Sequence, residues 1–228
     1  MIRVSDGVYQ LRAGGFANVY LIEGAQDLTL VDTGPSRCAP QLIEELRDNG
    51  FLPKNVARVV LTHAHPAHVG GTAALLELHP VRVYAHPKEL SVLQGKASVH
   101  RHGGLAGLIA VFGLHDSWTP IASVQPAETG TPLRGIPQWQ LLHTPGHTPG
   151  SLSLFHPGRQ ILMCGDVLSN RGGRLHVPSP HRDTDKAALR ASLAALAKLD
   201  CDILCCGHGS VVRGGAFRHI EAVLKKLG

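Results

Sequence analysis

Hydrophobic residues along this chain fall into short runs separated by amphipathic stretches. Three apolar or alternating runs come first, joined by connections with turn chemistry, over residues 8–11, 18–22 and 28–31. Runs of this length and pattern predict short β-strands. Residues 41–49 then place Leu42, Ile43 and Leu46 on one face, with charged residues opposite. This spacing predicts an amphipathic helix, with Gly50 as its C-terminal cap.

The same alternation continues to the end of the chain. Further strands are predicted over 56–61, 81–85, 139–142, 151–155, 160–166 and 202–206. Further helices are predicted over 72–79, from His86 onward, over 184–199 and over 216–227. Asp183 or Thr184 is the expected N-cap of the helix over 184–199. Strands that alternate with helices indicate a sheet whose outer face is covered by helices.

The composition is that of a globular protein with a sizeable core. The chain has 228 residues, of which 43% are hydrophobic and 17% charged. No linker or low-complexity segment divides it, so we expect one domain over residues 1–228. The formal net charge is +5, but the basic residues are scattered and aromatic residues are few. This distribution argues against a nucleic-acid-binding face and favours an anionic small molecule as the partner.

The sequence also bears on location and redox state. The first seven residues lack the apolar core of a signal peptide, and no run approaches the length of a membrane span. We therefore expect a cytoplasmic protein without a membrane partner. The five cysteines include no Cys-x-x-Cys pair, and Cys205 and Cys206 are adjacent, which is poor geometry for a disulfide. Reduced structural thiols are the expected state.

Residues 95–119 interrupt the pattern of strands and helices. This segment mixes glycines with apolar residues and contains His100, His102 and His115. Connections of this length are usually either functional or disordered. Two interpretations stay open, a partly helical lid over a site or a plain surface excursion.

The candidate chemistry centres on residues 61–71, which follow a run typical of a buried strand. Their sequence, LTHAHPAHVGG, contains His63, His65 and His68 within six positions. Imidazole is the commonest protein ligand for zinc and related metals, so a cluster this dense at a strand end predicts a metal site. Solvated loop histidines are the alternative. The apolar run before the cluster and the Gly-Gly pair after it argue against that alternative.

Other predicted strands end in groups that also bind metals. His147 follows one strand within the motif TPGHTPG, Asp166 ends another, and His208 lies between two glycines after the last. Loops at one edge of a sheet would let these side chains meet the early histidines around an ion. Asp32, which follows the run over 28–31, is either a turn cap or a residue that orients a metal ligand.

In these motifs the chain resembles the metallo-β-lactamase fold superfamily, in the hydrolase branch that includes glyoxalase II-like thioesterases. The matching motifs span nearly the whole chain in the family's order: VDTG (31–34), THxHxxHxGG (62–71), TPGHTPG (144–150), GD (165–166) and GHG (207–209). The resemblance implies an α/β (α+β) protein. Its fold would be an αββα sandwich of two facing mixed β-sheets, with helices on both outer sides and metals at one edge.

The resemblance also implies a set of metal ligands divided between two ions. The first ion would be held by His63, His65 and His147, and the second by His68 and His208, with Asp166 between them. Asp166 and His208 would also be the catalytic residues, and Asp32 would support the histidine loop from outside the metal shell. The implied cofactor is two zinc ions, with manganese or iron as alternatives.

One position departs from the family's pattern. Between the second and third histidines of the loop, the family has an aspartate that ligates the second metal, whereas this chain has Ala67. The second zinc could still be held by three ligands and water, namely His68, Asp166 and His208. Alternatively only the first site fills, so that one zinc is bound, with Asp166 as the fourth ligand. A third alternative is that the alanine was introduced to disable a normal enzyme.

The resulting functional hypothesis is a metal-dependent hydrolase in which a metal-bound hydroxide attacks a small ester-like substrate. A thiolate or a ring-opened alkoxide leaves with little help, so thioesters and lactones are favoured over amides. Ala67 is expected to lower turnover. The candidate substrate contacts are basic and favour an anionic substrate: His100, His102, Arg171, His176 and His181.

Two rival hypotheses come from other classes of protein. A mononuclear iron oxidoreductase, similar to a persulfide dioxygenase, could be built on His63, His147 and Asp166, because two histidines and one carboxylate form a common iron site. The second rival is a non-catalytic metal-binding domain. Metal content and turnover distinguish the three.

Overall fold

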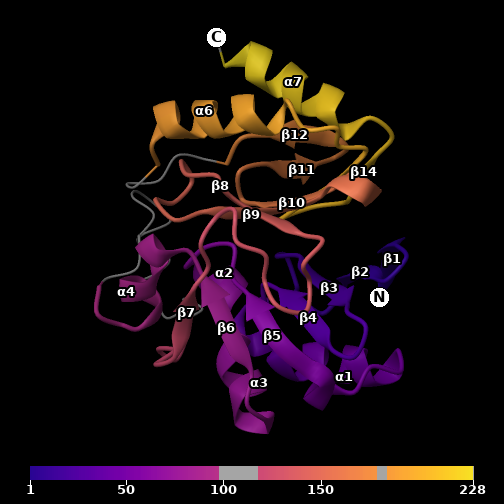
Figure 1. Ribbon diagram of the computed structural model, residues 1–228, viewed down its shortest axis with the longest axis vertical. Coiled ribbons are helices and arrows are strands. Elements are labelled where there is room, and N and C mark those ends of the chain that lie inside the picture. The colour runs from indigo at the N-terminus through magenta and orange to yellow at the C-terminus, as the bar shows by residue number, and fades with distance from the viewer. Residues whose placement is uncertain (98–117, 179–183, 228) are drawn as a thin grey trace.

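The strands form two facing sheets, and helices cover the outer side of each sheet (Figure 1). The computed structural model describes residues 1–97, 118–178 and 184–227. Within these ranges the larger sheet has seven strands, β1 to β7 in sequence order, and the smaller has five in the order β14-β13-β10-β9-β8. The αββα sandwich predicted from the sequence is confirmed.

The larger sheet changes from antiparallel to parallel pairing at its fourth strand. Its strands are β1 Ile2–Ser5, β2 Val8–Leu11, β3 Val19–Glu23, β4 Leu28–Val31, β5 Val56–Val60, β6 Arg82–Ala85 and β7 Val124–Pro126. Pairs from β1 to β4 are antiparallel, and pairs from β4 to β7 are parallel. Because parallel strands end at the same edge, the loops after β4 and β5 begin side by side.

The smaller sheet repeats this arrangement in part. Its strands are β8 Gln140–His143, β9 Leu152–His156, β10 Ile161–Gly165, β13 Ile203–Cys206 and β14 Val212–Arg213. β10 and β13 pair in parallel, so the residues that follow them leave the sheet at one edge. A two-stranded hairpin of β11 (Ser169–Arg171) and β12 (Arg174–His176) comes directly after β10.

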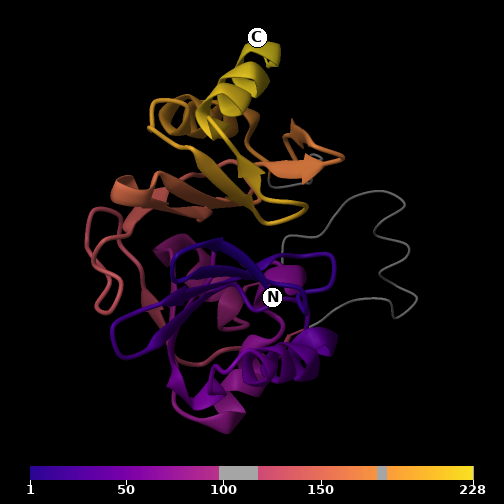
Figure 2. The same cartoon turned by 90° about the vertical axis from the view of Figure 1, so that its right-hand side faces the viewer.

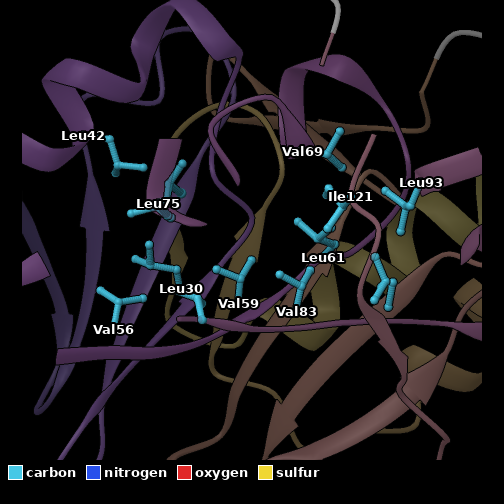
Figure 3. Close-up of a cluster of buried hydrophobic side chains, with 14 of the residues drawn as sticks. Leu30, Leu42, Val56, Val59, Leu61, Val69, Leu75, Val83, Leu93 and Ile121 are labelled. Atoms are coloured by element: carbon cyan, nitrogen blue, oxygen red, sulfur yellow. The ribbon is translucent and has the colours of Figure 1, made fainter. Parts of the chain in front are cut away.

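Side chains alternate between the two faces of each strand, so the larger sheet has a separate hydrophobic core on each face. Leu30 of β4 faces the helices, whereas its neighbour Val31 faces the other sheet. Figure 3 shows the helix side, where Leu42 and Leu75 pack over the sheet. These leucines come from α1 (Ala39–Asp48) and α3 (Thr72–Leu78). Burial of one such side chain contributes about 1.5–3 kcal/mol.

Two further helices cover the smaller sheet. They are α6 (Lys186–Leu196) and α7 (Ala216–Lys226), which lie at the opposite end of the molecule from α1 and α3 (Figure 2). Leu193 and Ile220 belong to the same buried cluster as Leu162 of β10. Since both faces of the central strands are buried, these strands read as continuous apolar runs in the sequence.

The structure corrects several predicted elements. The N-cap of α6 is Asp185, whose carboxylate accepts a hydrogen bond from the Ala188 backbone N–H at 2.9 Å, so the prediction of Asp183 or Thr184 is wrong. The helix predicted from His86 is a short 3-10 turn, η3 (Pro87–Glu89), followed by α4 (Leu90–Leu93). The sequence pattern missed the shortest elements: β1, β7, β11, β12, β14 and the four-residue helix α2 (Pro66–Val69). Runs this short carry too little periodicity to be recognised.

Several general features complete the fold. Three further 3-10 turns are η1 Ser36–Cys38, η2 Pro53–Asn55 and η4 Pro157–Arg159. In the described ranges, no helix combines the length and apolar character needed to cross a bilayer.

All five cysteines are free thiols, and burial raises the pKa of the Cys201 thiol to about 12. Neutral, buried thiols of this kind behave as core residues.

Candidate metal centre

Six potential metal ligands converge at the edge of the sandwich where the two sheets meet. The loop after β5 and the helix α2 provide His63, His65 and His68, and the loops after β8, β10 and β13 provide His147, Asp166 and His208. The first five are buried, and the His208 side chain keeps 28% of its surface exposed. Of the six, His208 is therefore the side chain most open to solvent.

Three of the histidines form a compact group. The candidate ligand atoms of His63, His65 and His147 all lie within 4.8 Å of one another. Nδ1 of His65 is 3.0 Å from Nε2 of His147. Two nitrogens bound to one tetrahedral zinc at about 2.0–2.1 Å would lie roughly 3.3 Å apart. The spacing of this pair fits a shared ion.

Asp166 lies between this group and the remaining histidines. Its Oδ2 is 3.5 Å from Nε2 of His147 and 3.1 Å from Nε2 of His208. Its Oδ1 is 3.6 Å from Nε2 of His68. One carboxylate thus faces ligand nitrogens on both sides, which is the arrangement needed to bridge two ions. Gly207 permits this approach, because a Cβ there would lie 2.1 Å from Asp166 Oδ1.

Buried polar atoms test whether the site suits a metal. Within the described part of the chain, Nε2 of His63, Nε2 of His68 and Oδ1 of Asp166 are buried without a hydrogen-bond partner. A buried polar atom left unpaired costs about 1–3 kcal/mol. Coordination would satisfy these atoms together, and imidazole with carboxylate is a donor set suited to zinc, manganese or iron.

Asp32 and Thr62 set the tautomers of two of these histidines. Oδ2 of Asp32 accepts a hydrogen bond from the Thr62 hydroxyl at 2.8 Å and lies 2.8 Å from Nδ1 of His68. Because the Thr62 hydroxyl donates to Asp32, its oxygen is free to accept from Nδ1 of His63, 3.0 Å away. Both rings then carry hydrogen on Nδ1 and direct Nε2 to the centre. The sequence predicted that Asp32 orients the histidine loop, but it did not predict the hydrogen bonds of Thr62.

The backbone of Asp32 is held in an unusual conformation. Its φ is 61°, in the left-handed region that residues other than glycine seldom adopt. Such conformations persist where surrounding contacts determine them. Here the Asp32 N–H donates to the Val60 carbonyl at 2.9 Å, and Oδ1 accepts from the Thr62 N–H at 2.7 Å. The strained turn directs the carboxylate at the histidine loop.

A loop of the larger sheet fixes His208 in the smaller one. Nδ1 of His208 is 2.8 Å from the Phe16 carbonyl oxygen, and since a carbonyl only accepts, this nitrogen carries the hydrogen. The Phe16 ring stacks on the imidazole with a centroid distance of 5.7 Å. Nδ2 of Asn18 donates to the carbonyls of Cys206 and Gly209 at 2.9 and 2.6 Å. The sequence analysis identified neither Phe16 nor Asn18 as a functional residue. The only signal for Asn18 was that a polar residue begins the predicted strand over 18–22.

The protonation states differ sharply within this cluster. Burial, together with the positive charge of neighbouring histidines, holds the pKa of His63 well below its usual value. Burial acts in the same direction on His68, but Asp166 and Asp32 outweigh it and raise the pKa of His68 to about 10. Burial would raise the pKa of Asp166, yet His68 and His208 hold it well below its usual range. The metal-free site therefore contains a neutral His63, a cationic His68 and an ionised Asp166.

The predicted substrate contacts are placed only in part. Arg171 and His176 are exposed on the β11–β12 hairpin, whose residue Asn170 donates its backbone N–H to the His208 carbonyl at 3.0 Å. His100, His102 and His181 lie outside the described residues, as does most of the segment 95–119, for which a lid and a surface excursion were the two interpretations. Ala67 is half-buried in α2, next to His68. The substrate roles of these residues stay predictions.

A histidine-rich edge of a two-sheet sandwich, with one carboxylate at its centre, is the arrangement of a metalloprotein. This chain belongs to the metallo-β-lactamase superfamily, whose family model matches residues 12–208. It is 27% identical over 223 residues to the probable metallo-hydrolase YflN of Bacillus subtilis, covering 89% of this chain and 84% of that one. A hydroxyacylglutathione hydrolase of Xylella fastidiosa is 29% identical over 202 residues, which are 86% of this chain and 62% of that enzyme.

Solved structures show the same fold. The metallo-β-lactamase family protein TTHA1429 of Thermus thermophilus superimposes with a TM-score of 0.76 at 23% identity, over 98% of this chain and 80% of that one. TTHA1623, solved in a di-iron-bound form, gives a TM-score of 0.71 at 30% identity, over 90% of this chain and 94% of that one. The family resemblance seen in the sequence motifs is confirmed.

Proposed function

We propose that this protein is a metal-dependent hydrolase of small esters, with thioesters and lactones as its substrate classes. The observation that carries the proposal is the central position of Asp166, within 3.6 Å of ligand nitrogens of His68, His147 and His208. Relatives named as metallo-hydrolases and as hydroxyacylglutathione hydrolases support a hydrolytic reaction. The latter extend well beyond the matched region, so their substrate is not assigned to this chain.

In the proposed site, His63, His65 and His147 would hold one ion, His68 and His208 would hold a second, and Asp166 would serve as a ligand shared by the two. A bound divalent metal would lower the pKa of coordinated water and would polarise the substrate carbonyl. The protein's part is to aim the ligand nitrogens of His63, His68 and His208 at the centre. Asp32, Thr62 and the Phe16 carbonyl do this by fixing hydrogen on the Nδ1 atoms.

The substrate class follows from the leaving group. If all five histidines of the centre ligate metal, none of them is left to donate a proton to the leaving group. Thiolates and ring-opened alkoxides leave without strong proton donation, whereas amines need it. The exposed basic residues of the β11–β12 hairpin, Arg171, Arg174 and His176, favour a substrate that carries negative charge.

Metal analysis combined with activity assays tests this proposal. We expect the purified protein to bind close to two zinc or manganese ions per chain and to hydrolyse thioesters or lactones. One iron per chain with substrate-dependent oxygen consumption would instead support the persulfide dioxygenase-like rival, built on His63, His147 and Asp166. Full metal binding without turnover on thioester, lactone and phosphodiester panels would support a non-catalytic domain.

The affinity for the second ion is expected to depend steeply on pH. Burial alone would lower the pKa of His68, but Asp166 and Asp32 raise it to about 10, so the metal-free protein keeps this ring protonated at neutral pH. A metal binds only the neutral ring and must displace that proton. Affinity should therefore rise about tenfold per pH unit from neutrality and level off near the pKa of His68. Competition with a chelator at a series of pH values measures this dependence.

Asp32→Asn provides the matched variant for the pH experiment. Loss of one of the two flanking carboxylates should lower the pKa of His68, so that affinity levels off at a lower pH than in the wild type. Curves of the same shape for the two proteins would contradict the role assigned to Asp32.

A further inference from the structure

Glu89 is a buried carboxylate that takes no part in the ligand set. It is the last residue of η3, and its side chain has no measurable exposure. It occupies the N-cap position of α4 but makes no side-chain hydrogen bond to that helix. Glutamate is seldom fully buried without partners, because removal of its charge from water is costly. Its hydrogen-bond partners therefore indicate its structural role.

Both oxygens of Glu89 accept hydrogen bonds from the backbone of other loops. Oε2 accepts from the Ala64 N–H at 2.9 Å, and Oε1 accepts from the Gly150 N–H at 2.7 Å. Hydrogen bonds to a charged acceptor are roughly twice as strong as those between neutral groups. The carboxylate thus bridges two segments that are 86 residues apart in the chain, at positions 64 and 150.

Those two segments carry the first group of ligands. Ala64 lies between His63 and His65, in the loop after β5 of the larger sheet, and Gly150 lies three residues after His147, in the loop between β8 and β9 of the smaller sheet. The pair formed by His65 Nδ1 and His147 Nε2, 3.0 Å apart, spans the same two loops. Glu89 adds to the backbone bond from Leu152 N–H to the Thr62 carbonyl, 2.8 Å long, which also joins them.

The space at Gly150 is matched to this carboxylate. A Cβ at Gly150 would lie 2.6 Å from both Cγ and Oε1 of Glu89, closer than real side chains come. Gly150 is not in a left-handed conformation, so its backbone angles do not require glycine. Glycine is required at this position because the Glu89 side chain approaches too closely to leave room for a Cβ.

We propose that Glu89 is a positioning residue of the metal centre, which sets the distance between the histidines contributed by the two sheets. It acts through the backbone of the ligand loops and touches neither the ion nor the substrate. The inference rests on the proposed metal site, but it concerns the first group, His63, His65 and His147, and does not depend on which substrate is hydrolysed.

Zinc affinity of Glu89→Gln and Glu89→Ala tests the proposal. The amide of glutamine keeps one acceptor but turns an NH2 group toward the other backbone N–H, so one of the two bonds is lost. We expect zinc affinity at the first site, measured by competition with a chromophoric chelator, to fall about 10-fold in Glu89→Gln and up to about 100-fold in Glu89→Ala. The visible absorption spectrum of the cobalt(II)-loaded protein should change as well, because it reports the ligand geometry.

A control variant separates positioning from stability. Arg58 is buried, and its guanidinium donates to Asp27 Oδ1 at 2.9 Å, in a contact that involves neither of the two ligand loops. Asp27→Asn should lower thermal stability and leave zinc affinity within about twofold of the wild type. A merely structural Glu89 would behave like Asp27, with reduced stability and unchanged zinc affinity.

The proposal is overturned if folded Glu89→Gln binds zinc as tightly as the wild type and gives the same cobalt spectrum. Should Glu89→Ala not fold, Gly150→Ala displaces the carboxylate from the opposite side and must show the same loss of zinc affinity as Glu89→Gln. Wild-type protein that binds two zinc ions but hydrolyses no ester would contradict the proposed function and leave the role of Glu89 standing.

Discussion

Asp166→Ala is expected to abolish metal-dependent hydrolysis. The carboxylate is buried between the two groups of histidines, with Oδ2 facing His147 and His208 and Oδ1 facing His68. Its removal takes away the ligand that both ions would share and leaves no negative charge between the two groups of histidines. We expect kcat/KM for a thioester to fall by more than about 100-fold, which is the upper range for loss of an outer-shell partner.

Metal content and kinetics of two variants check this expectation. Asp166→Asn has the same shape and keeps one coordinating oxygen but has no charge, so it should lose activity yet keep more metal than Asp166→Ala. Asp185→Ala, which removes a carboxylate from the exposed N-cap of α6, serves as the control for nonspecific effects. Retention of two metals and of wild-type turnover in Asp166→Ala would contradict the bridging role.

Ala67→Asp is expected to raise turnover. In the pattern that this chain resembles, an aspartate at this position ligates the second ion and accepts a hydrogen bond from the attacking hydroxide. Ala67 lies in α2 directly before His68, at the position where that pattern has its ligating aspartate. A positioned acid or base typically contributes 10²- to 10⁴-fold, and since three ligands remain, we expect a gain of about 10- to 100-fold in kcat/KM.

Ala67→Asn is the matched control for that gain. It has the size of aspartate but cannot carry the negative charge, so it should bind the second zinc no more tightly than the wild type and show little increase in rate. Steady-state hydrolysis of a thioester and zinc affinity, measured on the three proteins together, separate the effects of size and charge. Equal rates for wild type and Ala67→Asp would remove the aspartate from the mechanism.

The candidate ligands were visible in the sequence because each follows an apolar run. His63, Asp166 and His208 lie within three residues of the ends of the buried strands β5, β10 and β13, and His147 lies in the loop after β8. Strands that run in the same direction end at a common edge, so these loops can meet there. The same argument located Asp32. Hydrophobic periodicity predicted a sheet covered by helices on its outer face, because runs with period two and stretches with helical spacing record which faces are buried. The αββα sandwich itself was implied by the family resemblance of the motifs.

Residues that hold the loops in place carried no comparable signal. Glu89 has the sequence surroundings of an exposed residue at a helix start, and Thr62 resembles any polar residue at a strand end. Their roles depend on which backbone groups of distant loops come within 3 Å of their side chains.

The sequence by itself determined the longer strands, the longer covering helices and the identity of the candidate metal-binding side chains. The tertiary structure alone decided how those side chains are oriented: the hydrogen on Nδ1 of His63, His68 and His208, the central position of Asp166 and the link through Glu89. The physical reason is that hydrophobic periodicity is a local property of the chain. Hydrogen bonds between loops from different sheets exist only once the two sheets have packed together.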